Sequence, residues 1–594
     1  MQLSLANLYL RLKRMPDFYK HKWIDNTKNQ DLLLQLSELI NVNPIVLQVI
    51  LNRGFSTKEQ IENFLHPSIK QVTQEFCPKQ IGKALDRVAA AIKNKEKICV
   101  FGDYDADGVT GTVLLVEGLR HLGGDVSYYV PLRYSEGYGM NPDAVRLLHK
   151  QGIQLIVTVD CGISNYDEIV LAKELGIDVV VTDHHTPPEN LPPAVALINP
   201  KLEHKDDNTL LAGVGVAYKF LDKLFLKIRK SSLMTSKQYI ELVAIGTITD
   251  VVPLLGENRV FVTEGLKKLN GQKSLGLQYL LEKMGFKSKV DSFTIGFGIG
   301  PRLNAAGRLD SAKVAIDLLK TKSVKEAKAL SEELHQLNEK RKIEGNTIHS
   351  QSVAIVEKDQ SLLNKKVLVL SSDKWEAGVI GIVASQLAKK YERPVALISF
   401  KGNVARGSIR SFANVDIFSA LEGCKDLLMN FGGHKEAAGF EIAKDKIADF
   451  KVKYIDIIES QLSDQDLKSE ILIDRELLVS QINIETIEAL KVLEPYGEAN
   501  REPIFITKGL TPVDYECVGK DKAHLRVLFE KVDYVSMDDY QTHELSAIGF
   551  NMKEYKQILD NDTKFDVVYN LAINDFYGKT EPQLRILDIR PSKE

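Results

Sequence analysis

Three acidic residues alternate over five positions in the stretch GDYDADGVTG at 102–111. Asp103, Asp105 and Asp107 follow the apolar run 98–101 and precede apolar residues at helical spacing, which predicts a strand-to-helix turn. In extended chain, a period of two places the three carboxylates on one side. Crowded carboxylates repel one another unless a cation separates them, so the stretch predicts a divalent metal site. The alternative is a helix N-cap with spare surface acids, for which one Asp is sufficient.

Two further apolar runs end in residues that can bind a metal. The run 155–159 stops at Asp160, and the run 178–182 stops at Asp183, His184 and His185. Parallel strands joined by right-handed crossovers bring their carboxyl ends to the same edge of a sheet, so these residues are expected to meet the acids of 102–111. A role in a turn or a helix cap readily explains one Asp at the end of a strand. It explains less readily why three successive predicted strands end in such residues.

Asp250 is a fourth candidate, because it ends the apolar segment 242–248. The sequence leaves open whether this segment is a strand or a buried helix, and Asp250 alone is more typical of a helix end or a turn than of a ligand. Together the acids and histidines supply more ligands than one ion needs, which favours two metals. Mixed carboxylate and imidazole ligands suit Mn²⁺, with Mg²⁺ as the alternative, and two such ions indicate phosphoester hydrolysis.

The composition excludes several other classes of protein. The chain has 594 residues, a net charge of -3, 44% hydrophobic and 26% charged residues. This is typical of a soluble globular protein with several domains and without an overall basic surface. The five cysteines form no C-x-x-C pair, which argues against a zinc ribbon and favours a reducing cytoplasm. We expect neither a signal peptide nor a membrane span.

The order of the predicted elements gives an α/β fold with two α/β domains, a long connecting helix and a C-terminal β-barrel. Apolar runs alternate with amphipathic helices in the predicted catalytic domain, as in a parallel sheet. Short alternating strands near the C-terminus favour an oligonucleotide-binding (OB) fold. The predicted parts are an N-terminal helical segment (1–75), a catalytic domain (76–322), a connecting helix (323–358), a substrate-binding domain (359–460) and an OB-like nucleic-acid-binding domain (461–594).

Candidate phosphate-binding residues lie in three Gly-rich stretches. The first, GPRLNAAGRL at 300–309, is predicted to be a turn that presents Arg302 and Arg308 to phosphate. A structural turn whose arginines pair with acids explains it equally well. The other two are RGSIRS at 406–411 and GGH at 432–434, where small residues beside Arg, Ser and His can surround a phosphodiester.

Several motifs taken together resemble a known family. D-Y-D-A-D-G, D-C-G, D-H-H and the Asp of T-I-T-D resemble the four motifs of the DHH phosphoesterase superfamily, and R-G-S-I-R-S and G-G-H resemble its associated substrate-binding domain. Within the superfamily the chain is similar to the RecJ single-strand-specific DNA exonucleases, through W-x-x-G-V-I-G-I-V-A, G-P-R-L-N-A-A-G-R-L and H-L-R over about residues 45 to 590. The resemblance implies a 5′→3′ exonuclease of recombination and repair that acts on single-stranded DNA. Candidate protein partners are a single-strand-binding protein and a helicase.

The resemblance also implies roles for individual residues. The metal ligands would be Asp105, Asp107, Asp160, His184 and Asp250, with Asp103 as an extra ligand. His185 would assist at the phosphate, and Asp183 would orient the histidines. The residues that would hold the DNA are Arg302, Asn304, Arg308, Ser408, Arg410, Ser411, Gly432, Gly433 and His434. Glu376 and the stretch 495–501 depart from the family pattern and concern DNA affinity rather than the metals. Two alternatives stay open: a phosphodiesterase for short oligonucleotides or cyclic dinucleotides, and a non-catalytic replication scaffold.

Overall fold

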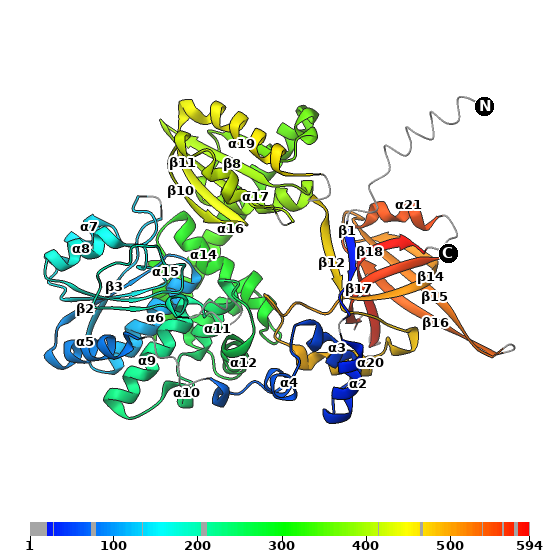
Figure 1. Ribbon diagram of the computed structural model, residues 1–594, viewed down its shortest axis with the longest axis horizontal. Coiled ribbons are helices and arrows are strands. Elements are labelled where there is room, and N and C mark those ends of the chain that lie inside the picture. The colour runs from blue at the N-terminus through cyan, green and yellow to red at the C-terminus, as the bar shows by residue number, and fades with distance from the viewer. Residues whose placement is uncertain are drawn as a thin grey trace. The chain divides into compact units, whose positions relative to one another are not determined.

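The computed structural model describes residues 21–27, 29–72, 79–133, 135–203, 211–413, 415–463, 467–536, 539–560, 564–574 and 580–592 (Figure 1). These residues form two compact units. One unit holds 62–347 together with the short segment 495–501, and the other holds the described residues up to 61, 348–494 and 502 onward.

A five-stranded parallel sheet forms the centre of the first unit. Its strands lie in the order β3, β2, β4, β5, β6. Their bounds are β2 (Lys97–Gly102), β3 (Asp125–Tyr129), β4 (Leu155–Val159), β5 (Asp178–Thr182) and β6 (Ala196–Ile198). The predicted runs 98–101, 155–159 and 178–182 are therefore strands, as expected, and they occupy adjacent places in the sheet.

Helices cover both faces of this sheet (Figure 1). One apolar core joins Val100 and Val157 to α5 (Ile81–Asn94), α6 (Ala106–His121) and α9 (Gly213–Arg229). A second core joins Phe101 and Ile156 to α7 (Pro142–Lys150) and α8 (Tyr166–Glu174). Neighbouring residues of one strand point to opposite faces, so the unbroken apolar runs are explained by a sheet that is buried on both sides.

The chain that follows the sheet is helical. Its elements are α10 (Leu233–Ser236), α11 (Ile240–Thr249), α12 (Gly256–Gly271), α13 (Leu275–Lys283), the π-helix η4 (Thr294–Ile299), α14 (Gly300–Leu309) and α15 (Lys313–Lys320). The open question about 242–248 is resolved, because this segment is the buried helix α11.

The predicted Gly-rich turn at 300–309 is wrong, because this stretch is the helix α14. Pro301 lies in its first turn, where proline favours a helix start. Gly307 serves packing and not a turn, since a Cβ atom there would lie 2.3 Å from the carbonyl oxygen of Tyr104. The glycines that indicated a turn are thus explained by a close contact between α14 and residues 103–107, which we call the acidic loop.

The N-terminal segment, predicted to be helical, also contains a strand. The apolar pattern lies in α2 (Gln30–Leu39), α3 (Pro44–Asn52) and α4 (Lys58–Leu65), but β1 (His21–Asp25) pairs in parallel with β12 (Ser469–Ile473). The prediction is wrong at 21–25, because this short strand is stabilised by a partner 448 residues away. Residues 1–20, 28 and 73–75 of the predicted segment lie outside the described residues.

The predicted connecting helix is α16 (Val324–Lys358), which runs for 35 residues. After it, a five-stranded sheet has the order β10, β11, β9, β8, β7. The bounds are β7 (Leu368–Ser372), β8 (Val395–Lys401), β9 (Val404–Arg410), β10 (Leu428–His434) and β11 (Ala437–Ala443), with α17 (Ala377–Tyr391), α18 (Ile417–Glu422) and α19 (Ile447–Gln461). Only β7 and β8 are parallel; the other neighbours are antiparallel.

A closed barrel ends the chain. Its strands are β14 (Phe505–Val518), β15 (His524–Ser536), β16 (Asp539–Gly549), β18 (Glu581–Pro591) and β17 (Phe565–Asn574), in this order, and a β14–β17 pairing closes the ring. The short β13 (Arg475–Glu476) pairs with β14, and the helices α20 (Ile484–Leu490) and α21 (Lys556–Leu559) lie in the same region. The predicted α/β class with a C-terminal OB-like barrel is confirmed. No helix among the described residues is long and apolar enough to cross a membrane.

Candidate metal centre

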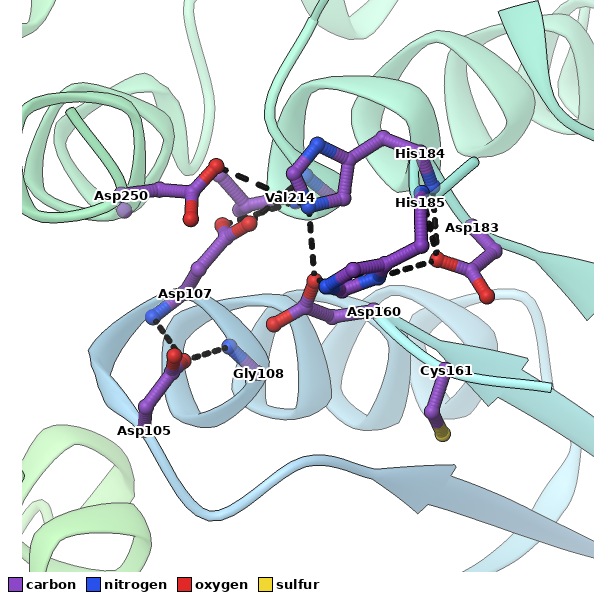
Figure 2. A network of polar contacts seen from close by, with 12 residues as sticks. Asp105, Asp107, Gly108, Asp160, Cys161, Asp183, His184, His185, Val214 and Asp250 are labelled. Carbon is purple, nitrogen blue, oxygen red and sulfur yellow. Dashed lines mark hydrogen bonds and ion pairs between the residues drawn. The ribbon is translucent and has the colours of Figure 1, made fainter. Parts of the chain in front are cut away.

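Four segments bring acids and histidines together beside the parallel sheet (Figure 2). Asp103 follows β2, Asp160 follows β4, and the Asp-His-His sequence follows β5; Asp250 caps the C-terminal end of α11. Their side chains form three groups in which one potential ligand atom per residue lies within 4.8 Å of the others: Asp103 with Asp105 and Asp160, Asp107 with His184 and Asp250, and Asp160 with His184 and His185. All six predicted metal ligands are therefore in one cluster, in which Asp160 and His184 each belong to more than one group.

The acidic loop combines helix capping with ligand placement. Asp105 is the N-cap of α6, and its Oδ1 accepts hydrogen bonds from the amides of Asp107 at 3.0 Å and Gly108 at 3.1 Å. Asp107 lies in the first turn of α6, and its two oxygens accept from the amides of Gly213 at 2.6 Å and Val214 at 3.0 Å. The three acids do not alternate along an extended strand, so that part of the prediction is wrong: the helix begins at Ala106.

Asp183 holds the two histidines. It is fully buried, and its Oδ1 accepts from the amide of His184 at 2.7 Å, the amide of His185 at 3.1 Å and the ring Nδ1 of His185 at 2.8 Å. Its Oδ2 accepts from the amide of Ile163 at 3.0 Å. Burial alone would raise the pKa of Asp183, but the hydrogen bond and charge of His185 outweigh burial and lower it. Asp183 is thus a fixed anion whose partners are the histidine turn itself.

The centre contains buried polar atoms without a partner in the part of the chain that the structure describes. Asp103 Oδ1, Asp160 Oδ1, His184 Nε2 and Asp250 Oδ2 are buried and have no hydrogen-bond partner among the described residues. His184 Nε2 lies 3.1 Å from Asp160 Oδ1 and 3.6 Å from Asp250 Oδ2. Buried polar atoms are normally paired, and a cation among these atoms would satisfy them together. The donor set, carboxylates with imidazole and no thiolate, fits Mn²⁺ or Mg²⁺.

The pKa values of the clustered acids and of His184 are shifted by burial and by neighbouring charges. Burial, and then the charges of neighbouring aspartates, raise the pKa of Asp107 to about 7 and those of Asp103, Asp160 and Asp250 well above the ordinary range. Burial, together with the charge of His185, lowers the pKa of His184 to about 3, so its imidazole is neutral at pH 7. A divalent cation binds neutral imidazole and deprotonated carboxylates, so its charge would offset the repulsion that raises the pKa values of these acids.

His185 has a different environment from His184. Burial alone would lower the pKa of His185, but the hydrogen bond and charge of Asp183 raise it. The hydroxyl oxygen of Tyr138 lies 3.0 Å from His185 Nδ1 and donates to the carbonyl oxygen of Asp160, also at 3.0 Å. Tyr138 was not among the predicted residues. The signal was a short E-G-Y-G sequence whose glycines have φ of 86° and 76°, in a loop that follows β3.

The predicted DNA-binding residues of the first unit lie on α14. Asn304 Oδ1 accepts the amide of Ala106 at 2.8 Å, so this side chain holds the acidic loop. Arg302 is only 8% exposed, and its Nη1 donates to the carbonyl oxygen of Gly298 at 2.9 Å. Arg308 is partly exposed one turn beyond Asn304. The structure therefore brings Asn304 to the metal centre, and it buries Arg302 among the helices that follow the sheet.

The predicted DNA-binding residues of the second unit lie at one end of its sheet. Ser408 and Gly432 both pair with Gly439 of β11, and Arg410 and His434 both pair with Ala437. Two strand spacings separate each pair, roughly 10 Å. The register therefore places Ser408 and Gly432 in one row across three neighbouring strands and Arg410 and His434 in a second row. Gly433 lies between Gly432 and His434 in β10.

Two hydrogen bonds fix polar side chains at this end of the sheet. Arg410 Nη1 donates to the Ser408 hydroxyl at 3.0 Å, and the Ser411 hydroxyl donates to the carbonyl oxygen of Val415 at 2.6 Å.

Glu376, which departs from the family pattern, forms an ion pair with Lys401. The other departure, at 495–501, packs in the first unit, where the carbonyl oxygen of Glu498 accepts the amide of Leu254 at 2.8 Å.

Comparisons with known proteins agree with this arrangement. Residues 97–247 match the N-terminal domain of the DHH family, 364–460 match the DHHA1 domain, and 473–588 match the RecJ OB domain. The single-stranded-DNA-specific exonuclease RecJ of Bacillus subtilis is 33% identical over 97% of this chain and 71% of its own length. RecJ of Haemophilus influenzae is 35% identical over 86% of this chain and 91% of its own length.

Solved structures give the same result. The crystal structure of Thermus thermophilus RecJ in complex with Mn²⁺ has a TM-score of 0.81 at 30% identity and covers 98% of this chain and 81% of that chain. A second structure of that protein, in complex with Mg²⁺, has a TM-score of 0.74 at 28% identity over 96% and 78% of the two chains. The parallel sheet, its acid-histidine cluster and the second α/β fold define a member of the DHH class. With the matching barrel and the extent of these similarities, the chain belongs to the RecJ family of single-stranded-DNA-specific exonucleases.

Proposed function

We propose that this chain is a metal-dependent exodeoxyribonuclease that is specific for single-stranded DNA, degrades it in the 5′→3′ direction, and acts in recombination and repair. The observation that carries the proposal is the cluster of buried, unpaired carboxylate and imidazole atoms beside the parallel sheet. Its relatives in Bacillus subtilis and Haemophilus influenzae are named as exonucleases of this specificity.

The cluster would hold two divalent ions, Mn²⁺ or Mg²⁺. The candidate ligands are Asp103, Asp105, Asp107, Asp160, His184 and Asp250. Both ions are supported by the Thermus thermophilus relative, whose structures are complexes with Mn²⁺ and with Mg²⁺. When bound, a pair of such ions lowers the pKa of water and stabilises charge on the attacking and leaving oxygens of an in-line displacement at phosphorus.

The chain's own residues orient the substrate and hold a proton on His185. Asp183 engages Nδ1 of His185, which leaves Nε2 to donate a hydrogen bond to a phosphate oxygen. The raised pKa of His185 favours the protonated ring that this role requires. Asp183 would act as a positioning residue, because it fixes the ring and both histidine amides.

The DNA would be held by the rows of small and basic residues in the second unit and by α14 in the first. Arg410 presents a fork of N–H donors beside the hydroxyl of Ser408, and His434 lies in the same register as Arg410, two strands away. We assign Ser411, Gly432 and Gly433 to the same phosphate-binding surface of the second unit. In the first unit we assign Arg302, Asn304 and Arg308 of α14 to the DNA. The burial of Arg302 favours a supporting role for that residue.

The proposed division of labour follows the predicted domains. Residues 76–322 would catalyse, 323–358 would connect, 359–460 would bind substrate and 461–594 would bind further nucleotides, with 1–75 as an N-terminal appendage. The substrate is single-stranded DNA, and we propose a single-strand-binding protein and a helicase as partners. We propose the cytoplasm as the place of this activity.

The test is digestion of a 5′-labelled single strand of a few dozen nucleotides with Mn²⁺. We expect the label to appear at once as a mononucleotide, and an identical duplex to stay intact. Inertness on this strand with rapid cleavage of dinucleotides would instead identify a hydrolase of short oligonucleotides. Binding of the strand without cleavage would identify a scaffold.

A further inference from the structure

Two phenylalanines stand in solvent at the π-helix η4. Phe293 is 66% exposed and Phe297 is 72% exposed. Their rings are stacked, with centroids 4.6 Å apart and planes inclined by 28°. Single exposed apolar residues are common in proteins, whereas a stacked aromatic pair forms one continuous apolar surface that a ligand can cover.

The backbone of η4 keeps both rings outside. Within η4, Ile295 and Ile299 are buried and Phe297 is exposed. Phe293, the residue before η4, is also exposed and stacks on Phe297. Gly296 and Gly298, which have no side chains, flank Phe297 in the sequence. π-Helical turns cost backbone regularity and occur frequently at functional sites. The irregular helix therefore presents the pair, and no part of the described core needs it.

The elements next to the aromatic pair pack on α11, the helix that Asp250 caps. Gly300, the first residue of α14, packs so closely on α11 that a Cβ there would lie 2.4 Å from Thr249 Cγ2, and Thr249 precedes Asp250. From Gly300, α14 continues to Asn304, which holds the acidic loop. Phe297 is three residues before Gly300 in the chain.

The size of the surface decides what it fits. A phenylalanine offers on the order of 200 Å², so two rings with these exposed fractions present roughly 250–300 Å². A stable protein partner needs about 800 Å² on each side, whereas one or two nucleobases need far less. The exposed Lys287 and Lys289 lie shortly before the pair in the chain, where they can offset phosphate charge.

We propose that Phe293 and Phe297 form a stacking platform for one or two unpaired bases of the substrate strand close to the scissile bond. This inference rests on the proposed single-stranded-DNA substrate and adds a base-binding site to it. Stacking on an aromatic face does not distinguish one base from another, so the platform would hold any sequence but only bases that are not paired. It would therefore help the enzyme select single strands.

The test combines variants with abasic substrates. A single abasic position is moved stepwise along a 5′-labelled strand, and KM is measured with Mn²⁺. For the unmodified protein we expect one or two positions at which the missing base raises KM about tenfold. For the double variant Phe293→Ala/Phe297→Ala we expect the intact strand to show that higher KM already, with no further effect of the abasic position. Leu147→Ala, at a 43% exposed residue of α7, is the matched control with unchanged KM.

Two outcomes would overturn the platform. One is an unchanged KM of the double variant on the intact strand; the other is a base effect and a variant effect that multiply independently. A separate readout uses Phe297→Trp, in which oligothymidylate should quench the fluorescence of the introduced indole; absence of quenching overturns the proposal even where the double variant folds poorly. Failure of the proposed function is distinguishable, because the unmodified protein would then leave the intact strand undigested.

Discussion

Removing the charge of Asp160 should stabilise the ion-free protein and destabilise the Mn²⁺-bound one. Asp160 is 2% exposed, its Oδ1 has no hydrogen-bond partner among the described residues, and burial with the charges of neighbouring aspartates raises its pKa. Asp160→Asn keeps the shape and removes the buried charge. Without ions the variant should therefore be more stable at pH 8, and with Mn²⁺ the unmodified protein should be more stable, because it keeps a shared ligand.

Asp107 gives the scale of the effect. Its pKa rises from 3.8 to about 7, which at about 1.4 kcal/mol per pH unit corresponds to ~4 kcal/mol of cost when the carboxylate is charged. A similar cost at Asp160 would shift the melting temperature of the 62–347 unit by on the order of 10 °C. The sign follows from the raised folded-state pKa: charging the acid costs stability as pH rises, so the gain from Asn should shrink as pH falls through that pKa.

The assay is thermal unfolding in EDTA and in millimolar Mn²⁺ at several pH values, with hydrolysis of single-stranded DNA measured in parallel. Asp143→Asn, at a side chain that is 97% exposed, is the isosteric control and should change neither stability nor activity. We expect Asp160→Asn to lower kcat at least a thousandfold while DNA binding persists. An Asn variant that is less stable than the unmodified protein in EDTA at pH 8 would refute the reasoning.

Three further predictions concern other parts of the centre. Asp183→Asn should lower kcat by about 10²- to 10⁴-fold and abolish the raised pKa of His185, which NMR titration of the ring would show; an unchanged titration would contradict the positioning role. Gly307→Ala should destabilise the protein by about 1–3 kcal/mol and reduce activity, because the new methyl group meets the acidic loop at 2.3 Å. Gly271→Ala, which has open space, is its control and should be nearly neutral in thermal unfolding. Mn²⁺ binding at pH 7 should release protons, since Asp107 with a pKa of about 7 is half protonated there; calorimetry in buffers of different ionisation enthalpy measures this, and equal heats in all buffers would count against it.

The sequence was most informative where a local pattern decides the structure. The bounds of β4 and β5 follow directly from their apolar runs, and their adjacency in a parallel sheet explains why Asp160 and His184 meet. The sequence left open whether Asp250 is a helix end or a metal ligand. In the structure it caps α11, and its Oδ2 also lies 3.6 Å from His184 Nε2. Residues that face a shared edge can thus be predicted without knowing their distances.

The failures have a common physical origin in long-range contacts. β1 depends on pairing with β12, and the glycines of α14 reflect the approach of Tyr104, which no local window contains. Backbone donors such as the amide of Gly213, which binds Asp107, carry no side-chain signature at all. Tyr138 was missed for a related reason, because its role depends on a loop that returns to His185.

The way in which each acid is held has an evolutionary consequence. Asp105 caps a helix and Asp183 closes a turn, so both would be retained by selection for folding even in a lineage that had lost catalysis. Asp103, Asp160 and Asp250 contribute buried oxygens that have no hydrogen-bond partner within the described ranges and that cost stability without an ion. In an inactive descendant these three positions should be the first to drift toward neutral residues. The pattern of loss among them would then date the end of activity, while an intact Asp105 or Asp183 would be no evidence of it.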